Sequence, residues 1–103
     1  MKNRYRVVIS PEAEKSLKEI YSYIEKQSPS AAKFVSKKLV AKAKGLSKMP
    51  ERFSREEFLL EREGNYRSVS QWQYKIVYRV QENDVLILNF FHTRRDPEEI
   101  RKL

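Results

Sequence analysis

The chain has 103 residues, with 22 Lys and Arg against 14 Asp and Glu, and a net charge of +8. This length supports a single domain over residues 1–103 with one modest core. No cysteine is present, which excludes a disulfide framework, a cysteine nucleophile and a zinc–thiolate site. The positive charge predicts an anionic partner, such as nucleic acid, an acidic protein or a membrane surface.

The N-terminus is polar and lacks the apolar segment of a signal peptide. No apolar stretch is long enough to cross a bilayer. We therefore expect a cytoplasmic protein with no membrane partner.

The first half of the chain predicts one strand and two helices. Residues 4–9 are rich in β-branched and aromatic side chains, which favour a strand. Ser10-Pro11 and Ser28-Pro29 each predict a helix start, with serine as the N-cap and proline in the first helical position. The second helix should run to about Lys48. Since only two or three residues separate the helices, we expect an antiparallel hairpin. The apolar stripe of the first helix comprises Ala13, Leu17, Ile20, Tyr21 and Ile24.

The second half predicts three consecutive strands. Residues 51–65 mix charged and apolar side chains and are expected to be mostly loop. Strands are expected at residues 66–72, 73–80 and 85–92, and residues 97–103 favour one terminal helical turn. The order β-α-α-β-β-β predicts an α+β fold, in which the helical hairpin packs on one face of an antiparallel twisted sheet.

Side-chain alternation predicts which residues of the last two strands share a face. A four-residue turn at 81–84 would pair Val80 with Val85. One face would then carry Lys75, Val77, Arg79, Leu86, Leu88, Phe90 and His92, and the other Tyr74, Ile76, Tyr78, Val85, Ile87 and Phe91. The last strand is apolar on both sides and needs two covers. The helical hairpin supplies one, and either residues 51–63 or a second protein supplies the other.

His92, the only histidine, stands at the end of the last predicted strand beside Arg94 and Arg95. Histidine exchanges protons near neutral pH, and cations stabilise the charge that develops on a reacting phosphate. His92 with Lys75, Arg79 or Arg94 therefore forms a possible RNA-cleaving set, with Glu57, Glu61 or Glu63 as a base. A structural or simply exposed histidine is the plainer interpretation.

Other chemical signals in the sequence are weak. No metal-ligand cluster, glycine-rich phosphate loop or serine–histidine–acid triad stands out, so we expect no metal and no cofactor. The lysines of the second helix fit a phosphate-binding stripe, but a solvated helix face explains them more simply. They are Lys33, Lys37, Lys38, Lys42, Lys44 and Lys48. The aromatic residues of the strands fit base-stacking platforms, although a core or a partner-facing surface is the more common role.

Several segments together resemble the RelE/ParE superfamily, the toxins of bacterial type II toxin–antitoxin systems. The matching segments are Ile9-Ser10-Pro11-Glu12-Ala13-Glu14, Tyr66-Arg67-Ser68, Tyr74 to Val80, Val85 to Leu88, and His92-Thr93-Arg94-Arg95-Asp96-Pro97. Each motif is loose by itself. Their order and spacing over nearly the whole chain carry the resemblance.

The resemblance implies a cytoplasmic toxin neutralised by a cognate antitoxin, often through an acidic segment that folds on binding. ParE-like members inhibit DNA gyrase, whereas RelE-like members cut messenger RNA on the ribosome. The long helical hairpin and the His-x-Arg-Arg-Asp ending favour a ParE-like gyrase inhibitor of the plasmid stabilisation type, without catalysis. A ribosome-dependent endoribonuclease and a non-toxic binding member are the alternatives. Operator DNA would be contacted only through the antitoxin.

The resemblance also suggests roles for individual residues. His92, Arg94 and Arg95 are expected to contact the target, and Leu86, Leu88, Phe90 and Trp72 the antitoxin. Under the endoribonuclease alternative, the catalytic candidates are His92, Lys75, Arg79 and Arg94. Some RNA-cleaving relatives pair a glutamate with a basic residue on the middle strand and a terminal histidine. Lys75 and His92 occupy comparable places, with Glu57 or Glu61 as the third group, but those relatives usually have arginine at the position of Lys75.

Overall fold

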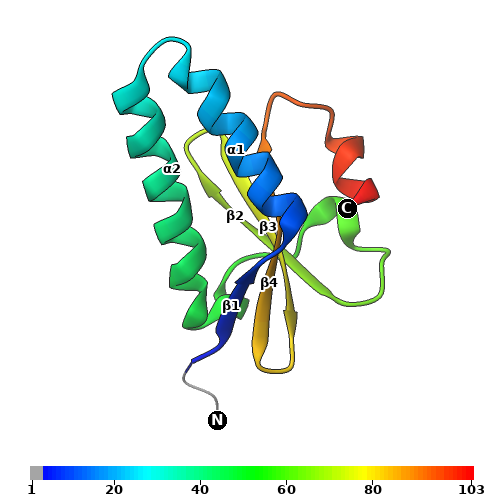
Figure 1. Cartoon of the computed structure of the whole chain (residues 1–103). Helices are drawn as coiled ribbons and strands as arrows, with labels where there is room; N and C mark the ends of the chain where they lie inside the picture. Colours follow the sequence, from blue (N-terminus) through cyan, green and yellow to red (C-terminus); the bar gives the residue numbers. More distant parts are fainter. Residues whose placement is uncertain (1–3) are drawn as a thin grey trace.

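A helical hairpin packs on one face of a four-stranded twisted sheet in the computed structural model, which describes residues 4–103 (Figure 1). The predicted α+β fold and the order of its elements are confirmed. The helices and strands are β1 (Arg6–Ile9), α1 (Pro11–Glu25), α2 (Pro29–Lys44), β2 (Asn65–Gln71), β3 (Tyr74–Gln81) and β4 (Asp84–His92). Short 3-10 turns complete the chain at η1 (Gly45–Ser47), η2 (Pro50–Arg52), η3 (Glu57–Leu59) and η4 (Pro97–Lys102).

Both helices begin at the predicted caps. The Ser10 hydroxyl accepts a hydrogen bond from the Ala13 amide at 3.0 Å, and the Ser28 hydroxyl accepts one from the Ala31 amide at 3.2 Å. Each bond satisfies one amide that has no partner within its helix. The α-helical part of the second helix ends at Lys44, and η1 continues the turn to Ser47, one residue short of the expected end.

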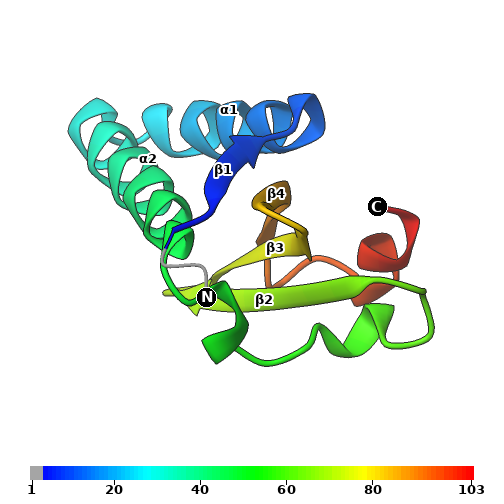
Figure 2. The same ribbon diagram turned by 90° about the horizontal axis from the view of Figure 1, so that it is seen from below.

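The sheet has the order β1-β4-β3-β2, so the last strand lies inside it and the first strand lies at an edge (Figure 2). β2 pairs with β3 and β3 with β4 in antiparallel fashion, as expected. β1 instead runs parallel to β4, with Val7 opposite Val85, which makes the sheet mixed. The helical hairpin connects β1 to the rest of the sheet, and parallel pairing requires a long connection of this kind.

An irregularity in β4 changes the predicted faces of its last residues. Val80 pairs with Val85 as predicted, but the register shifts between Val77 and Tyr78. One extra residue in β4 reverses the alternation beyond that point. The prediction is therefore correct for Leu86 and Leu88 but wrong for three residues: Phe90 and His92 lie on the helix side, and Phe91 lies on the opposite side.

Buried side chains form two clusters, one on each face of the sheet. The cluster under the helices includes Leu39, Ile76, Tyr78, Ile87 and Phe90. The opposite cluster comprises Leu59, Tyr66, Val77, Phe91 and Ile100, so η3 and η4 supply its cover. The sequence left open whether residues 51–63 or a second protein covers this face of the last strand. The structure shows residues of the chain itself there, from η3 and also from η4.

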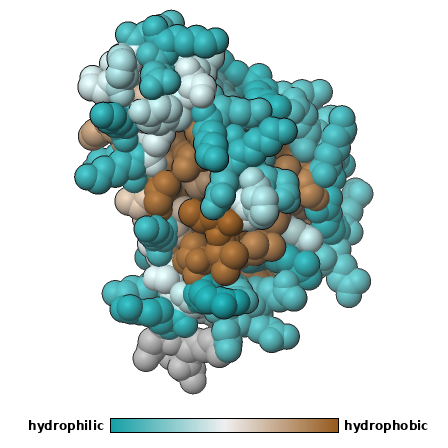
Figure 3. All heavy atoms as spheres, in the orientation of Figure 1, coloured by the Kyte–Doolittle hydropathy of each residue, from teal (hydrophilic) through white to brown (hydrophobic). Residues whose placement is uncertain are grey.

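The two covers do not hide all apolar side chains. Leu86 and Leu88 stay half-buried on the side of the sheet away from the helices. Figure 3 shows apolar side chains at the surface in the middle of one face of the molecule, surrounded by hydrophilic ones. Within residues 4–103, no helix combines the length and the apolarity needed to traverse a bilayer.

Candidate functional site

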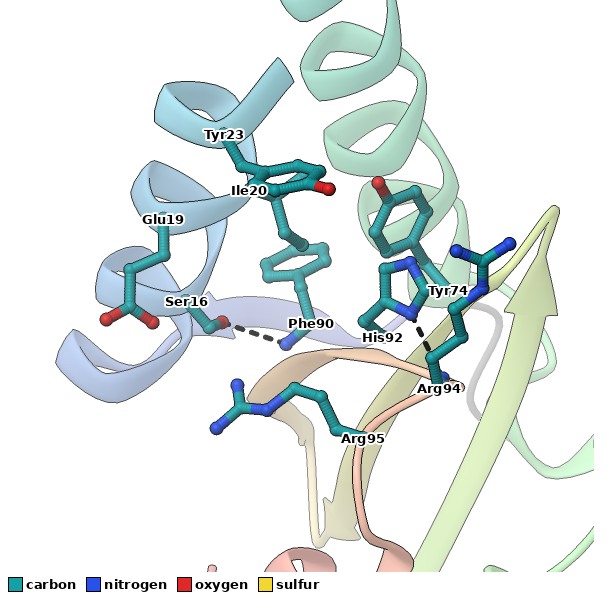
Figure 4. Close-up of a pocket in the computed structure, with 9 residues that line it drawn as sticks. All are labelled: Ser16, Glu19, Ile20, Tyr23, Tyr74, Phe90, His92, Arg94 and Arg95. Carbon is teal, nitrogen blue, oxygen red and sulfur yellow. Dashed lines mark hydrogen bonds between the residues drawn. The ribbon is translucent and has the colours of Figure 1, made fainter. Parts of the chain in front are cut away.

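A groove with a volume of about 340 Å³ lies between α1 and the ends of β3 and β4 (Figure 4). We call it the α1 groove. Its lining residues are Ser16, Glu19, Ile20 and Tyr23 from α1, Tyr74 from β3, Phe90 and His92 from β4, and Arg94 and Arg95 from the segment that follows β4.

Ser16 holds α1 against the sheet at the floor of this groove. β1 ends at Ile9, so the outer edge of β4 has no strand beside it beyond Ile87. The Ser16 hydroxyl takes the place of a strand partner, since it accepts a hydrogen bond from the Phe90 amide at 3.0 Å and donates one to the Ala13 carbonyl at 2.8 Å. Phe90 is 1% exposed beneath it. These contacts fix the position of α1 over the floor of the groove.

Aromatic rings form one wall of the α1 groove. Tyr74 and His92 meet edge to face, with ring centroids 5.1 Å apart. Burial, and to a lesser degree the nearby Tyr23, raise the pKa of the Tyr74 phenol, which therefore stays neutral. Tyr23 is 70% exposed at the rim. The wall thus offers apolar area together with hydroxyl groups that can bind a polar partner.

The His92 imidazole is held in its neutral form. Burial lowers its pKa, and the neighbouring Arg94 and Arg95 charges lower it further. In addition, Nδ1 accepts a hydrogen bond from the Arg94 amide at 3.0 Å, which leaves the proton on Nε2. The imidazole therefore presents an N–H donor to the groove, and the two arginines supply the positive charge.

We expect His92 to titrate below its ordinary pKa of about 6.5. The folded state disfavours the imidazolium. The stability that His92 contributes is therefore fully present above about pH 6.5, the pKa in the unfolded chain, and is lost as the pH falls from there through the lower pKa of the folded state. The measurement is a proton NMR titration of the imidazole resonances, which are unambiguous because the chain has one histidine. Arg94→Gln should raise the pKa of His92. A pKa at or above 6.5 in the parent protein would contradict the geometry.

The two arginines after β4 extend in different directions from the groove (Figure 4). Both are exposed. Arg95 donates a hydrogen bond to the carboxylate of Glu99 in η4, and such an exposed pair contributes about 0–1 kcal/mol. The arginines therefore act mainly as positive charge at the mouth of the groove.

A different pair of charged residues lies on the opposite face of the sheet. Lys75 Nζ is 3.0 Å from a carboxylate oxygen of Glu56, whose side chain is 0% exposed. The second Glu56 oxygen accepts a hydrogen bond from the Phe58 amide at 2.9 Å. Lys75 is therefore occupied by a structural ion pair. Glu56 was not among the glutamates singled out from the sequence, because nothing in a segment rich in glutamate marks the one that becomes buried.

The sheet separates the four candidates for RNA cleavage. His92 and Arg94 lie at the α1 groove, whereas Lys75 and Arg79 project from the other face. The Arg79 guanidinium lies 5.3 Å from the centre of the Tyr66 ring. The three glutamates proposed as a base are exposed in the η3 segment and just after it. The structure therefore brings His92 and Arg94 together at the α1 groove but separates them from Lys75 and Arg79.

The residues expected to contact an antitoxin do not form one surface either. Leu86 and Leu88 are half-buried on the side of the sheet away from the helices, and Phe90 is buried beneath α1. Trp72, in contrast, is 52% exposed at the tip of the β2–β3 hairpin.

Trp72 borders a second cavity of about 370 Å³, which we call the hairpin pocket. It is lined by Tyr23, Ile24, Gln27, Val35, Trp72, Gln73, Tyr74, His92 and Arg94. The sequence did not point to Tyr23, because its position on α1 resembles that of any exposed helical residue. Four residues, Tyr23, Tyr74, His92 and Arg94, belong to both cavities.

Among residues 4–103, no three histidine, aspartate or glutamate side chains group in a way that would hold a metal ion. The α1 groove itself offers aromatic walls, an imidazole and exposed guanidinium groups.

Comparison with known proteins places this geometry in context. Residues 7–97 match the family model of the ParE toxin of the type II toxin–antitoxin system parDE. A chain from the chromosomal ParDE system of P. aeruginosa superposes with a TM-score of 0.71 at 19% identity, covering 88% of this chain and 98% of the other. A chain from the RelBE2 toxin–antitoxin complex of Mycobacterium tuberculosis gives a TM-score of 0.62 at 25% identity, with coverages of 89% and 94%. No curated protein matches the sequence.

Proposed function

Because the chain belongs to the ParE toxin family of type II toxin–antitoxin systems, we propose that it arrests growth by binding and inhibiting DNA gyrase. It acts through protein contacts in the cytoplasm, without catalysis of its own. A cognate antitoxin neutralises it, and operator DNA is contacted only through that antitoxin. Stabilisation of the replicon that encodes the module follows from this pairing.

The observation that carries the proposal is the composition of the α1 groove. Tyrosine and arginine are among the residues that contribute most to binding at protein interfaces. Here Tyr23, Arg94 and Arg95 surround an apolar floor next to His92, whose lowered pKa favours the neutral imidazole. A site of this kind suits recognition of an acidic protein surface. We assign the target contacts to His92, Arg94 and Arg95.

The placement of the basic residues also favours binding over RNA cleavage. A general base, a general acid and a cation must all reach one phosphate. Lys75 is committed to Glu56 on one face of the sheet, and His92 lies on the other face. An endoribonuclease that pairs His92 with Lys75 would require these two groups to act together, and they lie on opposite faces of the sheet.

The test is a supercoiling assay with purified gyrase and relaxed plasmid, run beside a ribosomal translation assay with an mRNA cleavage readout. We expect the protein to inhibit supercoiling at concentrations that arrest growth and to leave the mRNA intact. Adding the cognate antitoxin should restore supercoiling. Unchanged supercoiling with mRNA cleavage would favour the endoribonuclease, and harmless overexpression without the antitoxin would favour a non-toxic binding member.

A further inference from the structure

Trp72 adopts a backbone conformation that is unfavourable for its side chain. It occupies the first position of the two-residue turn between Gln71 and Tyr74, with φ of 56°. Turns of this type normally place asparagine, aspartate or glycine there, because left-handed backbone crowds a bulky side chain. Glu82 occupies the same position in the turn between β3 and β4, with φ of 53°.

Burial does not compensate for this conformation. Trp72 remains 52% exposed, and its ring lies 6.0 Å from that of Phe34 on α2, which is itself 55% exposed. Glu82 shares this backbone, so the conformation alone assigns no role; Trp72 differs because the turn carries a large apolar ring that is left half exposed. Trp72 thus presents aromatic surface to solvent beside Phe34, where a partner could cover it.

Other exposed aromatic rings gather at the same end of the molecule. Tyr23, which is 70% exposed, lines the hairpin pocket together with Trp72. Ile24 and Val35 add apolar side chains from α1 and α2. The volume of about 370 Å³ accommodates a large apolar side chain of a partner.

The charged side chains at the hairpin pocket and beside Phe34 are positive. Arg94 lines the hairpin pocket, and the Lys38 ammonium lies 5.6 Å from the centre of the Phe34 ring. Among residues 4–103, no aspartate or glutamate lines this pocket, whereas the α1 groove includes Glu19. Aromatic surface bordered by cations complements a segment that carries both apolar and acidic side chains.

We propose that the hairpin pocket binds the antitoxin, with Trp72 as the main anchor for an apolar side chain that acidic residues flank. This inference rests on the proposed function and names the part of the toxin that the antitoxin recognises. The bound segment covers Tyr23, His92 and Arg94, which also line the α1 groove. Neutralisation therefore follows from physical occlusion of the target-binding residues.

The test compares Trp72→Asn with the matched control Glu82→Asn. Asparagine suits the left-handed position in both turns, so neither substitution should lower the melting temperature. The probe is the protein encoded by the reading frame adjoining the toxin gene. We expect Trp72→Asn to weaken binding of this probe at least 10-fold, since interface tryptophans are often dominant anchors, while Glu82→Asn binds like the parent.

The growth assay separates the possible outcomes. When the toxin is expressed without the adjoining protein, the parent and both variants should arrest growth. When the adjoining protein is expressed as well, only Trp72→Asn should still arrest growth. The inference would be overturned if the adjoining protein restored growth of cells that express Trp72→Asn as fully as growth of cells that express the parent. So would a variant that loses toxicity yet binds the probe normally, because Trp72 would then contact the target. A parent chain that never arrests growth would refute the proposed function instead, and the binding measurement would still test the pocket.

Discussion

Replacing Lys75 with methionine is expected to lower the free energy of unfolding by about 3–5 kcal/mol, because it leaves the Glu56 carboxylate buried without a counter-charge. Lys75 Nζ lies 5.4 Å from the centre of the Phe58 ring. Methionine keeps an unbranched apolar side chain near this ring. The loss of stability therefore measures the missing charge more than a loss of packing. Urea denaturation measures the change. It is large for a domain of this size, whose total stability is typically about 5–15 kcal/mol.

A second substitution distinguishes the ion pair from other effects. In the double variant Lys75→Met, Glu56→Gln, the buried group is neutral and still accepts the hydrogen bond from the Phe58 amide. We expect the double variant to recover to within about 1.5 kcal/mol of the parent, the usual range for one neutral hydrogen bond. Lys44→Met, at an exposed position of α2, should change stability by no more than about 0.5 kcal/mol.

The same double variant bears on function. If Lys75 serves only the fold, the double variant should inhibit gyrase and arrest growth like the parent. A stable double variant without toxicity would show that Lys75 contributes chemistry, and it would return the endoribonuclease alternative to first place. Loss of toxicity in the single variant alone carries no such meaning, because an unstable toxin is inactive for any mechanism.

Reversing the charges of Arg94 and Arg95 is expected to weaken inhibition of gyrase about 100-fold. Each arginine at a protein interface commonly contributes more than 1 kcal/mol, and 1.4 kcal/mol corresponds to a factor of ten in affinity. Both side chains are exposed, so Arg94→Glu, Arg95→Glu should leave the melting temperature nearly unchanged. The measurement is the toxin concentration that gives half-maximal inhibition of supercoiling.

The control for this experiment carries the same change in net charge elsewhere. Lys44 and Lys48 are exposed near the end of α2 and in the following turn, and neither lines the α1 groove. Lys44→Glu, Lys48→Glu should inhibit gyrase nearly as well as the parent. Equal losses in the two double variants would mean that overall charge, and not the groove, attracts the target. Raising the salt concentration should reduce the difference between them, since exposed charges are screened.

Local signals were sufficient to predict most of the architecture. The two Ser-Pro steps specified where the helices begin, because an N-cap hydroxyl and a proline act within one turn of the chain. The pairing of Val80 with Val85 followed from the short turn between β3 and β4. The parallel pairing of β1 with β4 left no comparable local trace, because it joins residues far apart in the sequence.

The candidate site was less predictable, and a single inserted residue explains much of this. The irregularity in β4 reverses the alternation on which the predicted faces depended, and it moves His92 away from Lys75. The burial of Glu56 depends on how the η3 segment folds over the sheet. Both features arise from tertiary packing, which overrides the local pattern. Trp72 was expected from the sequence to face a partner, which stays a prediction, and its left-handed backbone was not anticipated.

The position of β4 between β1 and β3 has a consequence for synthesis of the protein. The ribosome makes this strand last among the four, yet β1 has no other neighbour within the sheet. A growing chain therefore cannot complete its sheet, or the groove that β4 floors, until β4 itself has been made. Growth-arresting activity should emerge only after β4 has left the ribosome and joined β1 to β3, which gives a freshly translated antidote time to reach the toxin first.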